Sequence, residues 1–300
     1  MVMLRCVSGG CPWRIYTLCS WIHVLTSFLI LTSLFIAING ALKVYFSFLL
    51  YDKTIFLNPI LAAFFIMYAV YGLNKLTDLR EDAINTPERA KLIKKIAVLF
   101  KYSLLFSFIL SLLLVFSVNV ITLPILLFPL FSGIIYSLRV SPNLPRLKDI
   151  TAVKNTIVAL AWGVLSTLLP AICLVEKECM HIMALFYFFF LKSFINSTVF
   201  DVRDIEGDTI SGVRTIPVVF GRQRTKKLLI ILNSTFIPWL AFSYLAGFFH
   251  HHLVVLIFTI AYGYWYILHF CKEELKIGKS LDLFVDGEWI PVVLLCLPFR

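Results

Sequence analysis

Residues 181–200 read HIMALFYFFFLKSFINSTVF, an apolar run with one formal charge, Lys192, and Asp201 and Arg203 follow it directly. An α-helix needs about 20 mostly apolar residues to cross the hydrocarbon core of a bilayer. We therefore predict that this run is a transmembrane helix that ends in an acidic segment. Eight more stretches of similar character occur at 21–40, 54–73, 96–117, 118–136, 152–174, 228–247, 253–271 and 281–299.

The composition agrees with a chain built mostly from such helices. Of 300 residues, 60% are hydrophobic and 15% are charged, and the mean hydropathy is +0.91. Soluble domains have about 45–50% apolar and 25% charged residues, so a soluble protein is excluded. We predict one all-α, polytopic membrane domain over residues 1–300, with about nine transmembrane helices around a central cavity. The ninth stretch carries Asp286 and Glu288, which leaves open eight helices and an interfacial last segment.

The net charge of +10 is distributed by side rather than spread along the chain. With nine helices, 22 of the 27 cations fall at the N-terminus or in the loops after the even-numbered helices. By the positive-inside rule, this distribution places the N-terminus and those loops in the cytoplasm. We read the charge as a topology signal, and we expect no nucleic-acid partner. The cations assigned to the opposite side are Lys43, Lys53, Lys177 and Arg300.

The two longest hydrophilic loops, 74–95 and 201–227, each begin with acidic residues and then turn basic. In the first loop, Asn74, Asp78 and Asp82 are spaced four residues apart, so they share one face if the helix continues. In the second loop, carboxylates are spaced at i, i+3 and i+7, again one stripe, at Asp201, Asp204 and Asp208. The two sets lie four predicted helices apart, which suggests two similar halves that face each other across a cavity.

Such oxygen-only sets are typical of sites for hard divalent cations, and Mg²⁺ takes one or two carboxylates together with substrate phosphate and water. The seven cysteines form no CxxC pair, so neither a zinc site nor a disulfide framework is predicted. The alternative for these acids is that they cap helix ends and solvate loops. Acids inside the ends of apolar helices are unfavourable, by roughly 2.5–3.5 kcal/mol at the helix centre and less near the interface, which favours a function.

The two loops resemble the signature motifs of the UbiA family of membrane prenyltransferases. The first motif is Asn74-x3-Asp78-x3-Asp82-x2-Asn85-x-Pro87-x-Arg89, within residues 74–89, and the second, within 201–221, is Asp201-x2-Asp204-x3-Asp208-x3-Gly212-x2-Thr215-x5-Gly221. Between them, the segment from Tyr136 to Lys148 resembles the short basic segment that follows the family's fourth helix.

The resemblance implies a role for each of these positions. The metal ligands would be Asn74, Asp78, Asp82, Asp201, Asp204 and Asp208. The diphosphate would be bound by Lys148, Arg139, Tyr136, Ser137, Arg89 and Arg214, although these cations also fit the topology signal alone. Asp78, Asp204 and Lys148 would be the catalytic residues.

The activity implied is Mg²⁺-dependent transfer of a prenyl group from its diphosphate to an aromatic, quinone-precursor or lipid acceptor, at a site capped by cytoplasmic loops. The partners would be these two substrates and membrane lipid, without an obligate protein partner. We expect an integral protein of a prokaryotic cell membrane, with its N-terminus and both motifs on the cytoplasmic side.

A membrane transporter is the main competing interpretation, because intramembrane acids also mark ion pathways. Against it, the acids gather at one cytoplasmic edge rather than at the bilayer midplane. A membrane alcohol phosphotransferase is excluded, because Ile205 stands where that enzyme class requires glycine after the second aspartate.

Overall fold

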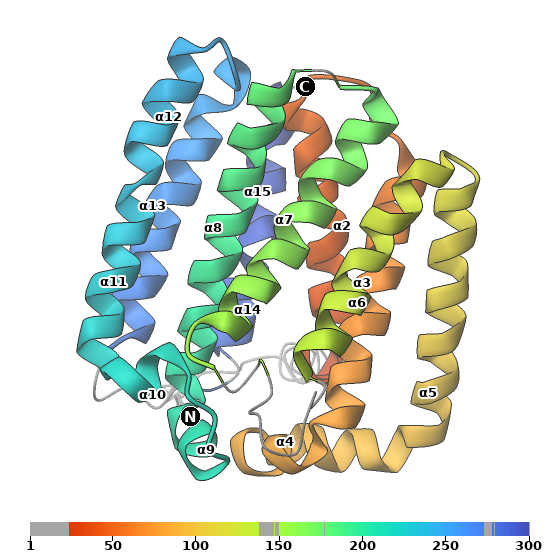
Figure 1. Ribbon diagram of the computed structural model, residues 1–300, viewed down its shortest axis with the longest axis vertical. Helices are drawn as coiled ribbons and strands as arrows, with labels where there is room; N and C mark the ends of the chain where they lie inside the picture. Colours follow the sequence, from red (N-terminus) through yellow and green to blue (C-terminus); the bar gives the residue numbers. More distant parts are fainter. Residues whose placement is uncertain are drawn as a thin grey trace, which may run out of the picture.

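The computed structural model describes residues 24–137, 147, 150–176, 178–272, 278 and 280–299, without the side chains of 80, 81, 136, 137 and 299. These residues form helices and connecting turns only, as predicted. Figure 1 shows them as one bundle of roughly parallel helices. The longer helices are α2 (Leu34–Leu50), α3 (Leu57–Thr77), α5 (Pro87–Phe116), α6 (Leu123–Ser137), α7 (Val153–Leu174), α8 (Cys179–Arg203), α11 (Arg222–Ser234), α12 (Phe236–Leu245) and α13 (Leu253–Phe270).

The number of membrane-spanning helices is lower than the sequence pattern suggests. Six helical segments in the described residues are long and apolar enough to cross a bilayer, or seven if a bent pair at the beginning counts as one span. All nine apolar stretches contain helix, but α6 has only 15 residues and the last stretch is broken, so a count of nine is not confirmed. Residues 222–245 form one such segment from α11 and α12.

The first apolar stretch differs from the predicted helix at 21–40. A short helix, Val24–Leu31, meets α2 at an angle of 77°, and Ser33 between them has φ 72°. Because α2 then continues to Leu50, Lys43 lies inside a helix and is buried, and its assignment to an outer loop was wrong.

The last apolar stretch is not one continuous helix. It consists of α14 (Ser280–Val285), a 3-10 turn at Asp286–Glu288, α15 (Trp289–Cys296) and a final 3-10 turn at Leu297–Phe299. Glu288 has no exposed surface and forms an ion pair with the equally buried Lys192 of α8. Glu288 therefore faces the protein interior, where Lys192 offsets the high cost of an unpaired charge in an apolar environment.

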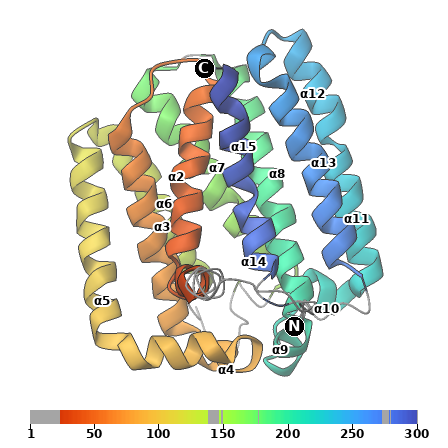
Figure 2. The same cartoon turned by 180° about the vertical axis from the view of Figure 1, so that it is seen from behind.

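A small hydrophobic core joins α2, α3 and α5, and two larger cores hold the bundle together on either side of α2. One joins α2 to α3, α6 and α7, and the other joins α2 to α8, α11 to α13 and α15. The second core is rich in packed rings, including Phe46, Phe188 and Trp289. In both views α3, α5 and α6 lie on one flank and α11 to α13 on the other (Figures 1 and 2).

The apolar side chains of α5 show how this protein meets lipid. Exposed hydrophobic residues recur along α5 at intervals of three or four, which places them on one face. A large exposed apolar face is expected where the solvent is a bilayer. Its members are Val98, Leu99, Tyr102, Leu105, Phe106, Ile109, Leu113 and Phe116.

Two short helices close one end of the bundle. They are α4 (Leu79–Asn85), between α3 and α5, and α9 (Ile205–Ile210), which follows α8. A further short helix, α10 (Ile216–Phe220), leads from α9 toward α11. Both α4 and α9 lie at the same end in Figure 1, and they contact each other. The two acidic loops thus meet although more than 100 residues separate them in sequence.

Candidate active site

A cavity of about 300 Å³ lies between the helices, at the end of the bundle that contains α4 and α9. All six predicted metal ligands line it, as do Asn85 and Arg89 from the same motifs. The described lining contains acids, amides, hydroxyls, cations and apolar groups, but neither His nor Cys. The structure therefore brings the two sequence motifs into one site.

The first motif bends at Asp78. The α3 helix ends at Thr77, and Asp78 has φ −96° and ψ 22° before α4 begins. The hydrogen bond from the Asp82 amide to the Asp78 carbonyl, 2.9 Å long, links the two helices across the bend. The condition for one shared helix face, that the helix continues through Asp82, is therefore not met, yet all three side chains line the cavity.

The second motif repeats this geometry at Asp204. The α8 helix ends at Arg203, Asp204 has φ −93° and ψ 9°, and the amide of Asp208 donates to the Asp204 carbonyl at 2.9 Å. The backbone angles at the two bends agree within a few degrees in φ. This local repeat supports the inference of two similar halves, which the sequence suggested by charge alone.

The contact between α4 and α9 depends on Gly207. A Cβ atom at this position would lie 1.8 Å from Oδ1 and 2.5 Å from Cγ of Asn85. Only glycine leaves room for the Asn85 side chain here, so the pair sets how closely the two motifs approach.

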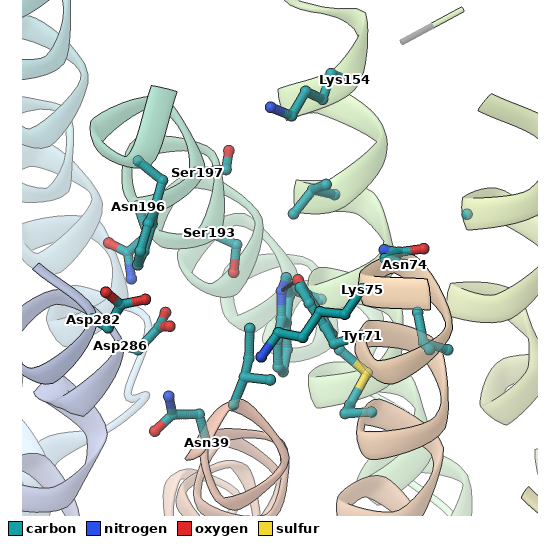
Figure 3. Close-up of a pocket in the computed structure, with 18 of the residues that line it drawn as sticks. Asn39, Tyr71, Asn74, Lys75, Lys154, Ser193, Asn196, Ser197, Asp282 and Asp286 are labelled. Atoms are coloured by element: carbon teal, nitrogen blue, oxygen red, sulfur yellow. Dashed lines mark hydrogen bonds between the residues drawn. The ribbon is translucent and has the colours of Figure 1, made fainter. Parts of the chain in front are cut away.

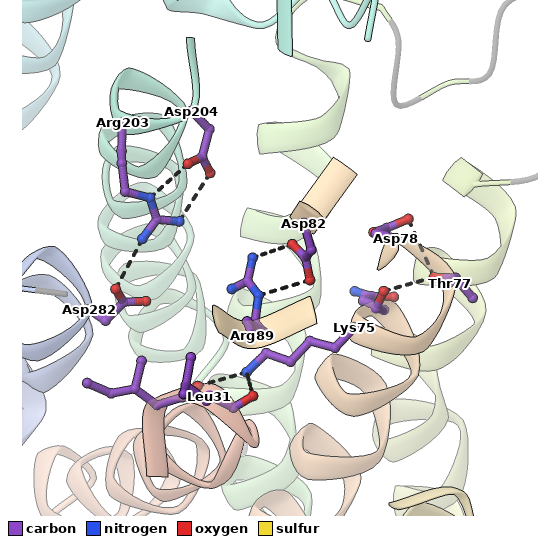
Figure 4. Close-up of polar contacts among 11 residues, drawn as sticks. Leu31, Lys75, Thr77, Asp78, Asp82, Arg89, Arg203, Asp204 and Asp282 are labelled. Carbon is purple, nitrogen blue, oxygen red and sulfur yellow. Dashed lines mark hydrogen bonds and ion pairs between the residues drawn. The ribbon is translucent and has the colours of Figure 1, made fainter. Parts of the chain in front are cut away.

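Each motif holds an acid in an ion pair with an arginine (Figure 4). Arg89 donates through Nε to Asp82 Oδ2 at 2.9 Å and pairs with the other carboxylate oxygen as well. Arg203 binds both oxygens of Asp204, at 2.8 and 3.1 Å, and also reaches Asp282 of α14 at 3.1 Å. These two-pronged pairs fix the carboxylates in orientation as well as charge.

Asp201 is held from α7. Lys154 Nζ donates to its Oδ1 at 2.8 Å, and Asn155 Nδ2 donates to its Oδ2 at 2.7 Å. The carboxylate is buried, with 1% of the residue exposed. Asp201 thereby holds Lys154 at the cavity wall, and the Lys154 ammonium group places a positive charge there.

Asp208 differs from the other acids of the second motif. Its Oδ2 is buried without a hydrogen-bond partner among the described residues. Burial raises the pKa of Asp208 to about 7, Lys154 opposes this rise, and the nearby Asp201 and Asp204 add to it. A carboxylate in such a place gains most from a cation that approaches from the cavity.

The donor set fits Mg²⁺ in chemistry. In the described part of the chain, no three His, Cys, Asp or Glu side chains converge on one metal position. Arginine and lysine hold several of the acids instead. The oxygen-only donors and the unpartnered Asp208 oxygen are what a hard divalent cation would use.

The predicted diphosphate ligands differ in whether the structure places them at the cavity. Arg89 lines the cavity, whereas Arg214 is exposed and is not among the described lining residues. Arg139 and Lys148, and the side chains of Tyr136 and Ser137, lie outside the part of the chain that the structure describes. Their roles remain predictions.

Several cavity residues were not identified from sequence. Lys75, next to Asn74, donates to the carbonyl groups of Ile30 and Leu31 at the end of the bent first helix, at 2.8 and 3.2 Å. The others are Asn39, Lys43, Lys154, Asn155, Arg203, Asp282 and Asp286, of which all but Asn155 line the cavity. Ionisable residues inside apolar stretches are a signal of function, and it could have singled out Lys43 and Asp286.

Comparison with known proteins agrees with this arrangement. The model of the "UbiA prenyltransferase family" matches residues 24–277. A digeranylgeranylglyceryl phosphate synthase of Sulfolobus acidocaldarius is 28% identical over 231 residues, which cover 76% of this chain and 80% of the relative.

Solved structures share the fold at lower identity. A UbiA homolog from Archaeoglobus fulgidus bound to GPP and Mg²⁺ has a TM-score of 0.67 at 20% identity, covering 91% of this chain and 97% of its own. A digeranylgeranylglyceryl phosphate synthase structure has a TM-score of 0.56 at 21% identity, covering 90% and 96%.

Proposed function

Since the chain belongs to the UbiA prenyltransferase family, we propose that it transfers a prenyl group from a prenyl diphosphate to a lipophilic acceptor, with Mg²⁺ as cofactor and diphosphate as the second product. The observation that carries this proposal is the convergence of both acidic motifs on one cavity. The Archaeoglobus homolog bound to GPP and Mg²⁺ supports the choice of donor and metal. Family membership favours the transferase over the transporter.

The six oxygen-bearing residues of the two motifs would hold Mg²⁺, and we name them the acidic rim: Asn74, Asp78, Asp82, Asp201, Asp204 and Asp208. When bound, Mg²⁺ neutralises the negative charge that grows on the departing diphosphate. Arg89, Arg203 and Lys154 already balance rim acids, and they lie where they could turn to diphosphate oxygens. Lys148, Arg139, Tyr136 and Ser137 stay in the proposed diphosphate site on the strength of the motif.

The inner cavity wall suits the other end of the donor. Apolar side chains such as Met67, Val70 and Ile157 can pack against the prenyl chain. Aromatic rings can stabilise the allylic carbon as it becomes electron-poor and can keep water away from it. The described rings that line the cavity are Phe35, Tyr71, Trp162, Phe200 and Trp289.

The acceptor is proposed as a class. The Sulfolobus relative is a digeranylgeranylglyceryl phosphate synthase, which favours a prenylated glycerol phosphate. An aromatic or quinone precursor is the second candidate. The cation distribution supports a cell-membrane protein with its N-terminus and the acidic rim facing the cytoplasm.

The decisive experiment is mass spectrometry of products. Purified protein is mixed with Mg²⁺, prenyl diphosphates of several lengths, and a panel of prenylated glycerol phosphates and aromatic acceptors. We expect a prenylated product and one diphosphate released per transfer. Neither prenyl transfer nor diphosphate release across the whole panel would contradict the proposal and return weight to a transporter.

A further inference from the structure

A set of polar side chains lies deeper in the cavity than the acidic rim. We name it the cavity floor, and it consists of Asn39, Lys43, Ser193 and Asn196, all lining the same cavity. Figure 3 labels Asn39, Ser193 and Asn196 at this pocket. Lys154 and Asp201 pair across α7 and α8 at the rim. Trp162 of α7 and Ser193 of α8 each lie eight residues from this pair, which is about 12 Å at 1.5 Å per residue. Both contact Lys43.

Among the described residues, no carboxylate is in direct contact with the buried ammonium group of Lys43. Its Nζ donates to Ser193 Oγ at 3.1 Å and lies 3.6 Å from the centre of the Trp162 ring. Only 4% of the residue is exposed. A hydroxyl and a ring stabilise an ammonium group, but they do not neutralise it.

Lys192 shows what a structural buried lysine looks like in the same protein. It forms an ion pair with Glu288, donates to the Thr259 carbonyl at 3.0 Å, and does not line the cavity. The contrast matters because both lysines are in apolar helices. Lys192 has its counter-ion within the fold, whereas Lys43 offers its charge to the cavity.

Asn39 is an independent sign of a missing ligand. It stands one turn before Lys43 on α2, and 3% of it is exposed. Its Oδ1 has no hydrogen-bond partner among the described residues although it lines the cavity. A buried amide oxygen without a partner is unfavourable unless something supplies a donor.

Asp286 stands between the rim and the floor. It is one turn beyond Asp282, which shares Arg203 with Asp204 at the rim. Asp286 lines the cavity and interacts electrostatically with Lys43, but no direct ion pair joins the two in the described structure. The cavity therefore presents a separated negative and positive group, with room between them.

We propose that the cavity floor and Asp286 form the acceptor subsite, and that the acceptor is a hydroxylated anion. Lys43 binds its phosphate or carboxylate group, and Asn39 Oδ1 accepts a hydrogen bond from the P–OH group of a phosphate monoanion. Asp286 accepts a hydrogen bond from the nucleophilic hydroxyl, and it takes that proton as the new C–O bond forms and diphosphate leaves. This subsite rests on the proposed prenyl transfer, because it gives the second substrate a place below the diphosphate.

The pairing of charges selects this class over neutral acceptors. A neutral lipid alcohol would leave Lys43 desolvated without an anion, whereas an anionic acceptor supplies the missing counter-charge. A hydrogen bond to Asp286 also makes the hydroxyl oxygen more electron-rich, as nucleophilic attack on the prenyl carbon requires. A prenylated glycerol phosphate satisfies all of these requirements, whereas a hydroxybenzoate supplies the anion and the hydroxyl but no donor for Asn39.

The test uses pairs of acceptors in which one member carries the anionic group and the other lacks it. One pair is a monoprenylated glycerol phosphate and the same alcohol without phosphate, and the other is 4-hydroxybenzoate and 4-hydroxybenzyl alcohol. Acceptor KM and kcat are measured for the wild type, Lys43→Met and Lys43→Arg. Acceptor affinity is also measured directly, in the presence of an unreactive prenyl thiodiphosphate.

We expect Lys43→Met to raise the KM of the anionic member of the accepted pair by about 10- to 100-fold, the usual effect of losing a hydrogen bond to a charged group. The neutral member should change little, and Lys43→Arg should restore part of the difference. Asp286→Asn should lower kcat more than it raises KM. Lys53→Met is the control for loss of a lysine charge, since Lys53 lies outside the cavity and pairs with Glu176, and it should not change the preference for the anion.

The outcomes separate this inference from the proposed function. Equal losses for anionic and neutral acceptors in Lys43→Met would overturn the subsite while leaving prenyl transfer intact. If the wild type transfers no prenyl group, binding still decides, because an anion preference lost in Lys43→Met supports the subsite and its absence contradicts it. Retained binding of prenyl thiodiphosphate shows that each variant is folded.

Discussion

The acidic rim and the cavity floor handle buried charge in opposite ways. At the rim, Asp82, Asp201 and Asp204 each have a cation from the protein itself in direct contact. At the floor, Lys43 contacts a hydroxyl and a ring, and no acid among the described residues contacts it. Three of the five rim acids therefore have resident counter-ions, whereas an Asp208 oxygen has no hydrogen-bond partner among the described residues, so the rim keeps an excess of acid for a metal. The floor is unbalanced, and it should bind an anion without rearrangement.

The strongest test of this contrast removes rim acids. We expect Asp78→Ala and Asp204→Ala each to reduce prenyl transfer by at least about 10³-fold, because each removes an oxygen from the proposed metal site. Asp52→Ala is the matched control, since Asp52 is exposed and lies outside the cavity. Turnover and melting in detergent are measured together. Near-normal turnover in either rim variant would mean that these acids serve only the fold.

Removal of the metal should separate the two regions directly. With EDTA, the affinity for a prenyl thiodiphosphate should fall by about 10²-fold or more, because the rim acids then repel the diphosphate. Acceptor affinity measured without prenyl diphosphate should not change, because Lys43 needs no metal to attract an anion. Titration by calorimetry in both conditions checks this. Equal diphosphate affinity with and without EDTA would contradict a metal site at the rim.

Lys148 tests whether a cation from the segment after α6 belongs with the rim. If it neutralises the leaving diphosphate, Lys148→Ala should slow the chemical step by about 10²-fold. Lys148→Arg keeps the charge but changes its shape, so we expect partial recovery. Single-turnover kinetics at saturating prenyl diphosphate give the rate of that step. An unchanged rate in Lys148→Ala would leave the resident cations Arg89, Arg203 and Lys154 as the diphosphate ligands.

The smallest effect concerns the contact that joins the two halves of the rim. Gly207→Ala should lower the free energy of unfolding by about 1–3 kcal/mol, because the new methyl group collides with Asn85. In the Asn85→Ala background the same change should stabilise the protein, by roughly 0.5–1 kcal/mol, since alanine is the better helix former. Thermal melting of the four proteins checks this reversal. The same sign in both backgrounds would show that Asn85 does not set this spacing.

The rim could be predicted from sequence because its residues are close together in the chain and regularly spaced. Asn74, Asp78 and Asp82 stand out even though the helix that was expected to carry them bends. The floor as a set could not be predicted, because its members are single polar residues on helices from distant parts of the chain, although a charge within an apolar run could have singled out Lys43 by itself. No spacing joins them, and only the packing of α2 against α7 and α8 brings them together.

The fold was predictable to a similar degree. Apolar stretches identified the helical segments, because burial in lipid or protein requires apolar side chains over many consecutive turns. Bends were not visible, since the break at Thr32–Ser33 and the turn at Asp286–Glu288 lie within apolar sequence that would also suit a continuous helix. These two breaks account for the misplacement of Lys43 and for the unrecognised role of Asp286.

The buried ion pair between Lys192 and Glu288 affects how the protein is inserted into the membrane. The ribosome delivers α8 to the membrane long before it delivers Glu288, so Lys192 enters the bilayer without its partner. A lone lysine at the centre of a helix makes insertion less favourable by about 2.5–3.5 kcal/mol. We therefore expect α8 to stay beside the insertion machinery, or against earlier helices, until the last segment arrives. A ribosome-bound chain that stops before residue 280 should be more sensitive to protease than one that includes the last segment.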